Sequence, residues 1–217
     1  MTTNANPMPL STSQSLSGKC ALVTGSTSGI GLGIACALAA NGANIMLNGF
    51  GDHTQAKRRI ESFGVEVDYH GADMSKPDEI EALMAATAKR FGRTDILVNN
   101  AGIGGIGRFA EASPDRLRQI MEVNFFAPVE LTRILLPALH RGSNPVICNI
   151  GSVLGHRAVP DKSEYCASKF AMHGWSDSLR AELAADGIQV TLVSPSTTKS
   201  EFFDSLIETD PNRSSRS

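Results

Sequence analysis

The chain has 217 residues, which suits one domain with a substantial core and disfavours two independent domains. Hydrophobic residues make up 41% of it and charged residues 19%, a balance typical of a globular protein and unlike that of a disordered one. The net charge of −2, without a long run of one sign, disfavours a surface that binds nucleic acid.

The first residues, 1–17, are rich in Ser, Thr, Asn and Pro, and we expect them to form a disordered leader. They contain no apolar run long enough for a signal peptide or a membrane span, so no membrane association is expected. One domain is expected over 18–207 and a polar tail over 208–217. Four scattered cysteines without a Cys-x-x-Cys pair indicate buried reduced thiols and hence a cytoplasmic protein.

From Lys19 onward, short β-branched runs alternate with helix-length segments, which predicts an α/β fold with a parallel sheet covered on both faces. Strands are expected at 20–24, 44–48, 65–70, 96–99, 145–150 and 188–193. Helices are expected at 31–41, 54–63, 77–91, 114–140 and 163–186. This order predicts a doubly wound sheet, the three-layer Rossmann fold, with strand order 3-2-1-4-5-6. No seventh strand is evident, so we expect the sheet to lack its last strand and to leave the sixth at an edge.

The first strand runs into a glycine-rich loop, Thr24-Gly25-Ser26-Thr27-Ser28-Gly29-Ile30-Gly31, and then into a helix. Glycines in such a place let a pyrophosphate approach backbone amides at a helix N-terminus, where the helix dipole favours negative charge. A tight turn without a ligand is the alternative. The position of the loop between the first strand and the first helix favours nucleotide binding.

Four further motifs follow in order. The fourth strand ends in Asn99-Asn100-Ala101-Gly102, Asn124 lies in the long helix, Ser152 follows the fifth strand, and Tyr165-Cys166-Ala167-Ser168-Lys169 lies in the last helix. Together with the loop spacing G-x-x-x-G-x-G, they resemble the short-chain dehydrogenase/reductase family over roughly 19–200. The resemblance implies an NAD(P)-dependent oxidoreductase that moves a hydride between nicotinamide and a secondary alcohol or ketone. It also implies a catalytic tetrad of Asn124, Ser152, Tyr165 and Lys169.

The residue types of this tetrad suit that chemistry. Tyr165 and Lys169 lie one helical turn apart, so the ammonium can stabilise a phenolate and Tyr165 can act as general acid and base. Ser152 can hydrogen-bond the substrate oxygen, where charge develops. Pro128 has no N–H, which frees the carbonyl of Asn124 to bind a water molecule. The similar asparagine of the family holds a water in a proton relay, and a merely kinked helix is the alternative.

The second strand ends in Asn48-Gly49-Phe50, without an acidic residue for the adenosine ribose and without a cation for a 2′-phosphate, so we expect NAD and not NADP. The resemblance implies that Asp73 and Met74 flank the adenine. It also places Pro195-Ser196 at the nicotinamide, where the family has glycine after the proline. No metal is expected. The expected cofactor-binding residues are Gly25, Ser26, Thr27, Ser28, Gly29, Ile30, Gly31, Asn48, Gly49, Phe50, Asp73, Met74, Asn100, Ala101, Gly102, Tyr165, Lys169, Pro195, Ser196 and Thr198.

The stretch 25–52 resembles the bacterial D-3-hydroxybutyrate dehydrogenases in particular. Their carboxylate-binding glutamine and histidine are replaced here by Gly104 and Leu154, whereas Lys162 matches their carboxylate-binding lysine. The expected substrate residues are therefore Ser152, Leu154 and Lys162, with a solvated surface lysine as the alternative for Lys162. A 3-hydroxyacid such as 3-hydroxybutyrate stays open as substrate, and apolar residues near the site favour a less polar alcohol or ketone.

Two other functions stay open. One is a truncated, catalytically impaired dinucleotide-binding protein, and the other is a partner-binding relic that aggregates through its exposed sixth strand. Thermal melting and a substrate screen separate these possibilities. The resemblance further implies a homodimer or homotetramer built on the long helices.

Overall fold

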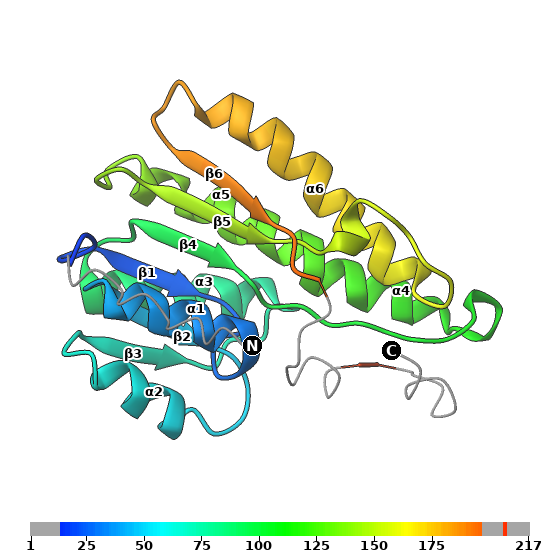
Figure 1. Cartoon of the computed structure of the whole chain (residues 1–217), viewed down its shortest axis with the longest axis horizontal. Coiled ribbons are helices and arrows are strands. Elements are labelled where there is room, and N and C mark those ends of the chain that lie inside the picture. Colours follow the sequence, from blue (N-terminus) through cyan, green and yellow to red (C-terminus); the bar gives the residue numbers. More distant parts are fainter. Residues whose placement is uncertain (1–13, 197–205, 208–217) are drawn as a thin grey trace, which may run out of the picture.

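The computed structural model describes residues 14–196 and 206–207 (Figure 1). Most of the predicted leader, the predicted tail 208–217 and Thr198 lie outside this range. Residues 14–17, which were expected to belong to the leader, are part of the folded domain. Leu16 donates its N–H to the carbonyl of Asn41 at 2.9 Å and packs against the hydrophobic cluster on one face of the sheet.

A six-stranded sheet forms the middle layer, with the order β3-β2-β1-β4-β5-β6, and every strand pairs in parallel with its neighbours. This confirms the order predicted from the sequence. Because the strands are parallel, their carboxyl ends meet at one edge of the sheet, and the strand order reverses between β1 and β4. The strands are β1 (Cys20–Val23), β2 (Asn44–Asn48), β3 (Val67–His70), β4 (Ile96–Asn99), β5 (Val146–Ile150) and β6 (Gln189–Val193).

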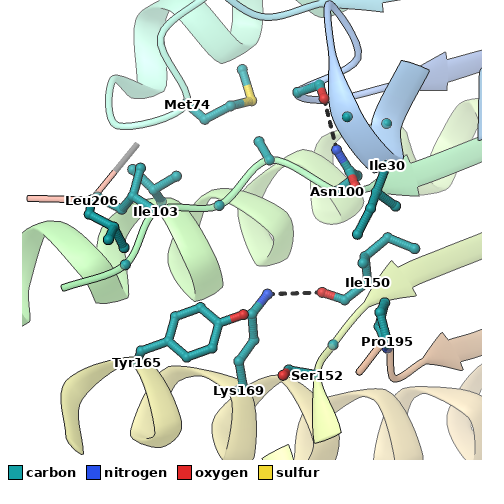
Figure 2. Close-up of a pocket in the computed structure, with 18 of the residues that line it drawn as sticks. Ile30, Met74, Asn100, Ile103, Ile150, Ser152, Tyr165, Lys169, Pro195 and Leu206 are labelled. Carbon is teal, nitrogen blue, oxygen red and sulfur yellow. Dashed lines mark hydrogen bonds between the residues drawn. The ribbon is translucent and has the colours of Figure 1, made fainter. Parts of the chain in front are cut away.

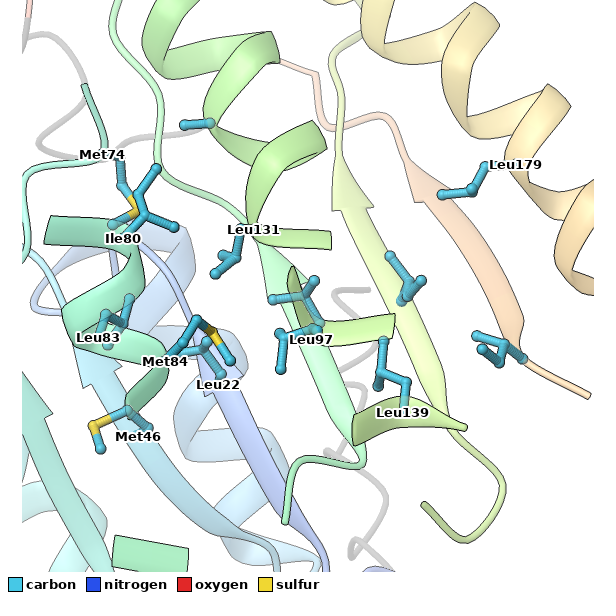
Figure 3. Close-up of a cluster of buried hydrophobic side chains, with 14 of the residues drawn as sticks. Leu22, Met46, Met74, Ile80, Leu83, Met84, Leu97, Leu131, Leu139 and Leu179 are labelled. Carbon is cyan, nitrogen blue, oxygen red and sulfur yellow. The ribbon is translucent and has the colours of Figure 1, made fainter. Parts of the chain in front are cut away.

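Helices cover both faces of the sheet (Figure 1). One face packs against α1 (Gly29–Ala40) and α2 (Thr54–Glu61), and the other against α3 (Pro77–Phe91), α5 (Ala127–Leu139) and α6 (Ser163–Leu183). Successive strand residues point to opposite layers: Leu22 joins the cluster under α3 and α5, whereas Ala21 and Val23 join the cluster under α1. Figure 3 shows the first of these clusters, in which each fully buried leucine contributes roughly 1.5–3 kcal/mol relative to an exposed one.

The helix predicted over 114–140 is interrupted. It begins as α4 (Pro114–Met121), passes through a π-helical turn, η2 (Glu122–Phe126), and continues as α5. The N–H of Ala127 bonds to the carbonyl of Glu122, five residues earlier. Pro128 has no N–H to donate, so the hydrogen-bond pattern of the α-helix cannot continue at this residue. The wider π-helical turn accommodates the missing hydrogen bond. Two short 3₁₀ turns, η1 (Phe109–Glu111) and η3 (Val153–Gly155), lie in the loops after β4 and β5.

Asp95 precedes β4 and ties three segments together from a fully buried position. Its carboxylate accepts N–H groups from Cys20 at 3.0 Å and Ser143 at 3.1 Å, and the Nε of Arg93 donates to it at 2.8 Å. Burial alone would raise the pKa of Asp95, but the hydrogen bonds from Arg93 and the two backbone groups outweigh it and hold the pKa below its usual value.

We expect Asp95→Asn to lower the free energy of unfolding by about 2–4 kcal/mol at neutral pH, because the buried amide cannot replace the carboxylate at all three donors. The folded-state pKa of Asp95 is depressed, so its stabilisation is present above the unfolded-state pKa and is lost as the pH falls through the folded value. Urea unfolding of both proteins at pH 7 and below about pH 4 should therefore show a difference that shrinks in acid. A difference independent of pH would contradict this role.

Candidate active site

A cleft of about 520 Å³ opens at the carboxyl ends of the central strands (Figure 2). It lies at the point where the strand order reverses, which is where doubly wound sheets bind ligands. The structure brings nearly all the predicted site residues into this one cleft. Of those that it describes, Ser26 and Asn124 do not line the cleft, and Thr198 lies outside the described residues.

The glycine loop is packed too tightly for side chains at its centre. A Cβ built on Gly31 would lie 2.2 Å from the carbonyl oxygen of Gly25 and 2.5 Å from Nδ2 of Asn100. That amide nitrogen donates to the carbonyls of Thr24 and Gly25, both at 2.9 Å. Asn100 therefore holds the loop against the end of β4, and only glycine at position 31 permits this approach.

The start of α1 fits a bound diphosphate. Its first residue, Gly29, has a left-handed φ of +53°. The preceding Ser28 makes no capping side-chain bond, and the first turn carries no acidic residue. The first N–H groups and the positive end of the helix dipole thus lie at the cleft wall without a capping side chain or a carboxylate beside them. The loop is a backbone cradle of the kind that a dinucleotide diphosphate requires.

Asn48, at the end of β2, is 1% exposed and holds the cradle in place. Its Nδ2 donates to the carbonyls of His70 at 3.0 Å and Ala72 at 2.9 Å, and its Oδ1 accepts the N–H of Gly25 at 3.3 Å. Both polar atoms of the side chain are engaged within the protein. The side chain of Asn48 therefore positions the glycine loop, and Asn48 lines the cleft together with Gly49 and Phe50.

Ser26 has a similar supporting position behind the loop. Its Oγ donates to the carbonyl of Val23 at 2.7 Å and accepts the N–H of Asn48 at 3.1 Å. After β3, on the same side of the cleft as the loop, the Oδ1 of Asp73 accepts the N–H of Ser75 at 2.9 Å, which fixes the turn that presents Asp73 and Met74 to the cleft.

Tyr165 and Lys169 project from α6 into the cleft, as Figure 2 shows. The Nζ of Lys169 donates to the carbonyl of Ile150 at 2.9 Å and lies 5.6 Å from the centre of the Tyr165 ring. Ser152 follows β5 on the same side, where its Oγ accepts the N–H of Leu154 at 3.1 Å and forms a hydrogen bond with Tyr165. Three members of the predicted tetrad are thus in one place.

Burial dominates the electrostatics of this group. It raises the pKa of Tyr165 above its usual value, and the hydrogen bond with Ser152 offsets only part of the rise. Burial also lowers the pKa of Lys169 to about 8. The residues of the chain by themselves therefore keep the phenol protonated at neutral pH, and a lowered tyrosine pKa requires an additional positive charge in the cleft.

Asn124 lies behind the cleft wall in the π-helical turn and is 1% exposed. Its Oδ1 accepts the N–H of Ile103 at 2.8 Å, and its Nδ2 donates to the carbonyl of Ile103 at 2.9 Å and to Oγ of Ser168 at 3.0 Å. The side chain ties the loop after β4 to α6. The predicted relay depends on its main-chain carbonyl and stays a prediction.

Apart from the glycine loop, much of the cleft lining is aliphatic. Lys162 also lines this cleft, and it and Lys169 are the cations among the described lining residues. Leu206, which sequence reasoning did not single out, comes from the far end of the chain and pairs with Gly104, where the N–H of Ile207 bonds to the Gly104 carbonyl at 2.8 Å. The aliphatic lining residues include Ile103, Ile106, Val153, Leu154, Val159 and Leu206.

Ser196 takes the place of the glycine that the resemblance led us to expect. Among the described non-glycine residues, Asn144 and Asp161 have a left-handed φ. The φ of Ser196 therefore lies in a region that non-glycine residues commonly adopt. Ser196 and Pro195 both line the cleft beside β5. A serine at this position is therefore compatible with the shape of the site.

No helix in the described ranges is both long and apolar enough to cross a bilayer. Within residues 14–196 and 206–207 no group of three or more His, Cys, Asp and Glu side chains is arranged to hold a metal ion.

Residues 19–211 match the family model of the short chain dehydrogenases. A D-beta-hydroxybutyrate dehydrogenase of Cupriavidus necator is 45% identical over 182 residues, which cover 83% of this chain and 70% of that protein. Another of the same name, from Rhizobium meliloti, is 40% identical, with 82% and 70% covered. A 3-ketoacyl-(acyl-carrier-protein) reductase from Brucella melitensis, complexed with NADH, superposes with a TM-score of 0.80 at 31% identity, over 89% of this chain and 82% of that one. The chain therefore belongs to the short-chain dehydrogenase/reductase family and is an oxidoreductase that acts on alcohol or ketone groups with a nicotinamide dinucleotide.

Proposed function

We propose that this enzyme uses NAD and interconverts apolar secondary alcohols and ketones. The observation that carries the proposal is the single cleft that joins the glycine cradle to Ser152, Tyr165 and Lys169 and that has a largely aliphatic lining apart from the glycine loop. When bound, the nicotinamide supplies the hydride acceptor or donor. The chain supplies binding, orientation and proton transfer.

The predicted binding residues divide the cleft into three parts. The loop 25–31 would hold the diphosphate, Asp73 and Met74 would contact the adenine, and the segments 100–102 and 195–196 would contact the nicotinamide end. Tyr165 and Lys169 would bind the ribose beside the nicotinamide. Their places in one continuous cleft support this assignment.

In the direction of ketone reduction, Tyr165 donates the proton of its phenol to the carbonyl oxygen, and Ser152 stabilises the charge that develops there. Lys169, buried against the carbonyl of Ile150, stabilises the phenolate that results. The main-chain carbonyl of Asn124 would hold the water through which the proton is replaced. In alcohol oxidation the same groups act in reverse.

Discrimination between NAD and NADP would be decided at the end of β2. The cations that line the cleft, Lys162 and Lys169, belong to α6 and its N-cap on the opposite wall, and Phe50 stands 68% exposed at the rim. A 2′-phosphate in this place would meet no positive side chain from the described lining. This supports the preference for NAD.

We expect calorimetric titration to show NADH binding at least about tenfold tighter than NADPH, because an unpaired phosphate loses its hydration without gaining an ion pair. Phe50→Arg should reduce or reverse this ratio by supplying the missing cation. Phe63→Arg, at another exposed phenylalanine near the end of α2, is the matched control and should leave the ratio unchanged. Equal binding of the two cofactors by the unmodified protein would refute the preference.

The substrate end of the cleft favours an uncharged molecule. Gly104 and Leu154 occupy the positions of the polar residues that the 3-hydroxybutyrate resemblance predicts, and the neighbouring side chains are aliphatic. Among the described lining residues, Lys162 is the cation outside the predicted tetrad that could compensate a carboxylate placed there. Lys162 as a carboxylate-binding residue remains the alternative.

A matched substrate pair tests this choice. We expect methyl 3-hydroxybutyrate to be oxidised with a kcat/KM at least about tenfold above that of 3-hydroxybutyrate, since the two differ in the charge of one end. The reverse preference, abolished by Lys162→Met, would identify a hydroxyacid enzyme. NADH binding without turnover of either compound, or of a broad alcohol and ketone panel, would instead favour the non-catalytic dinucleotide-binding protein.

We also propose a homodimer or homotetramer that buries the outer surfaces of η2 and α6. Phe126 and Phe170 are 50% and 45% exposed on these elements, whereas Leu179 packs into the core cluster and Trp175 packs against it. Sedimentation equilibrium should show an oligomer. We also propose a cytoplasmic location, which is supported by four cysteines that form no disulfide, three of them buried.

A further inference from the structure

A buried ion pair lies directly beside the catalytic tyrosine in the chain. Arg116 in α4 and Glu164 in the first turn of α6 are 2% and 3% exposed. The Nη2 and Nε of Arg116 donate to Oε1 of Glu164 at 2.7 and 3.1 Å, and Oγ of Ser163 donates to Oε2 at 2.8 Å. A buried pair of this kind is seldom more stabilising than apolar side chains of the same size, so stability alone does not explain it.

The first turn of α6 needs an external support. Lys162, at its N-cap, makes no capping side-chain bond, and Tyr165 lies in this same turn. The Glu164 carboxylate accepts the backbone N–H of its own residue within this turn, so the position of the helix end depends on where Arg116 holds that carboxylate. The start of α4, by contrast, is well fixed: Oγ of Ser113 accepts the N–H of Arg116 at 3.2 Å, and Pro114 occupies the first helical position.

A second contact fixes α6 one turn further on. Nδ2 of Asn124 donates to Oγ of Ser168 at 3.0 Å, and that hydroxyl donates to the carbonyl of Tyr165 at 2.8 Å. Tyr165 therefore lies between two attachments to the segment formed by α4 and the π-helical turn. The Arg116–Glu164 pair is the attachment on the N-terminal side.

Arg116 also contacts the substrate end of the cleft. A Cβ built on Gly105, which lines the cleft, would lie 3.0 Å from Cδ of Arg116 and 3.1 Å from the carbonyl oxygen of Ile207. The arginine stem thus packs against the loop with which Leu206 and Ile207 pair. One side chain connects this loop to the turn that carries Tyr165.

We propose that Arg116 and Glu164 are positioning residues, which hold the first turn of α6 so that the phenol of Tyr165 keeps its place beside Ser152 and Lys169. Both act through Tyr165. The proposal rests on the proposed role of Tyr165 as general acid and base.

The double variant Arg116→Met/Glu164→Met separates positioning from stability, because apolar replacement of both partners removes the pair without leaving a buried charge. The chain has two tyrosines, so the ultraviolet difference between each protein and its Tyr165→Phe counterpart reports the ionisation of Tyr165. We expect the double variant to melt no lower than the wild type and to bind NADH within about twofold. We also expect its Tyr165 to titrate about one pH unit higher in the NAD⁺ complex, with a kcat on methyl 3-hydroxybutyrate about tenfold lower.

An unchanged titration and an unchanged kcat in a stable double variant would overturn the proposal. If the double variant does not fold, Arg116→Lys is measured in the same way, because it keeps the charge but replaces the rigid guanidinium fork. A Tyr165 titration and a kcat equal to those of the wild type in Arg116→Lys would also overturn the proposal. The titration needs no substrate. It therefore measures the effect of the Arg116–Glu164 pair on Tyr165 even if the wild type does not turn over alcohols. Such a lack of turnover would contradict the proposed reaction but not the positioning role of the pair.

Discussion

Replacing Tyr165 by phenylalanine should lower kcat by about 10²–10⁴-fold while leaving NADH affinity within about threefold of the wild type. The hydroxyl is the group in the cleft that hydrogen-bonds with Ser152, whereas the ring and Lys169 remain in place without it. Loss of the proton donor should therefore affect the chemical step far more than cofactor binding, to which the hydroxyl would contribute one ribose contact among many. Steady-state kinetics and calorimetric titration on the same preparation measure the two quantities.

Tyr69→Phe is the matched control. Tyr69 is the other tyrosine of the chain. Its hydroxyl donates to the carbonyl of Gly49 at 2.8 Å, at the cofactor-binding side of the sheet. We expect this variant to keep its kcat. Full turnover by Tyr165→Phe would remove the proposed mechanism, and equal losses in both variants would indicate a general effect on the fold.

Gly31→Ala should abolish measurable NADH binding and destabilise the protein by about 1–3 kcal/mol, because the added methyl group collides with backbone. Its Cβ would lie 2.2 Å from the Gly25 oxygen, a contact that the loop can relieve only by moving away from Asn100. That movement destroys the cradle. Urea unfolding and NADH titration measure the two effects.

The chain offers a control two positions along the same helix. A Cβ on Gly33 meets nothing within 4 Å, so Gly33→Ala should stabilise the protein by roughly 0.5–1 kcal/mol through the higher helix propensity of alanine. NADH affinity should not change. Similar results for the two substitutions would show that the tight approach at Gly31 is not required.

The periodic pattern of the sequence was enough to predict the sheet. Strands β2 and β4 and helix α3 have the predicted bounds, because each is delimited by Gly, Pro or Asn next to a strong apolar run. The helix over 114–140 was predicted as continuous, although Pro128 had been recognised as an obstacle. Pattern alone does not show whether a proline kinks a helix or widens one turn, since the neighbouring elements decide this.

Side-chain roles were harder to predict than positions. Asn48 lines the cleft, and its role as a cofactor contact stays a prediction, but the sequence does not reveal that its amide bonds to Gly25, His70 and Ala72. The Arg116–Glu164 pair joins residues 48 positions apart, with no short-range pattern that pairs them. Hydrogen bonds between distant segments depend on the assembled fold, so a local motif cannot reveal them.

The buried amide of Asn48 has a consequence for attempts to redesign the cofactor preference. An aspartate here, the residue type that commonly binds the adenosine ribose, would turn a carboxylate oxygen toward the carbonyls of His70 and Ala72 in place of the N–H groups they now accept. The side chain at the end of β2 therefore has a structural role, because it joins β2 and β3 to the glycine loop. An acidic side chain could not make the same hydrogen bonds. A library that aims to change cofactor choice should keep Asn48 fixed and vary Phe50, whose exposed ring leaves room for new side chains.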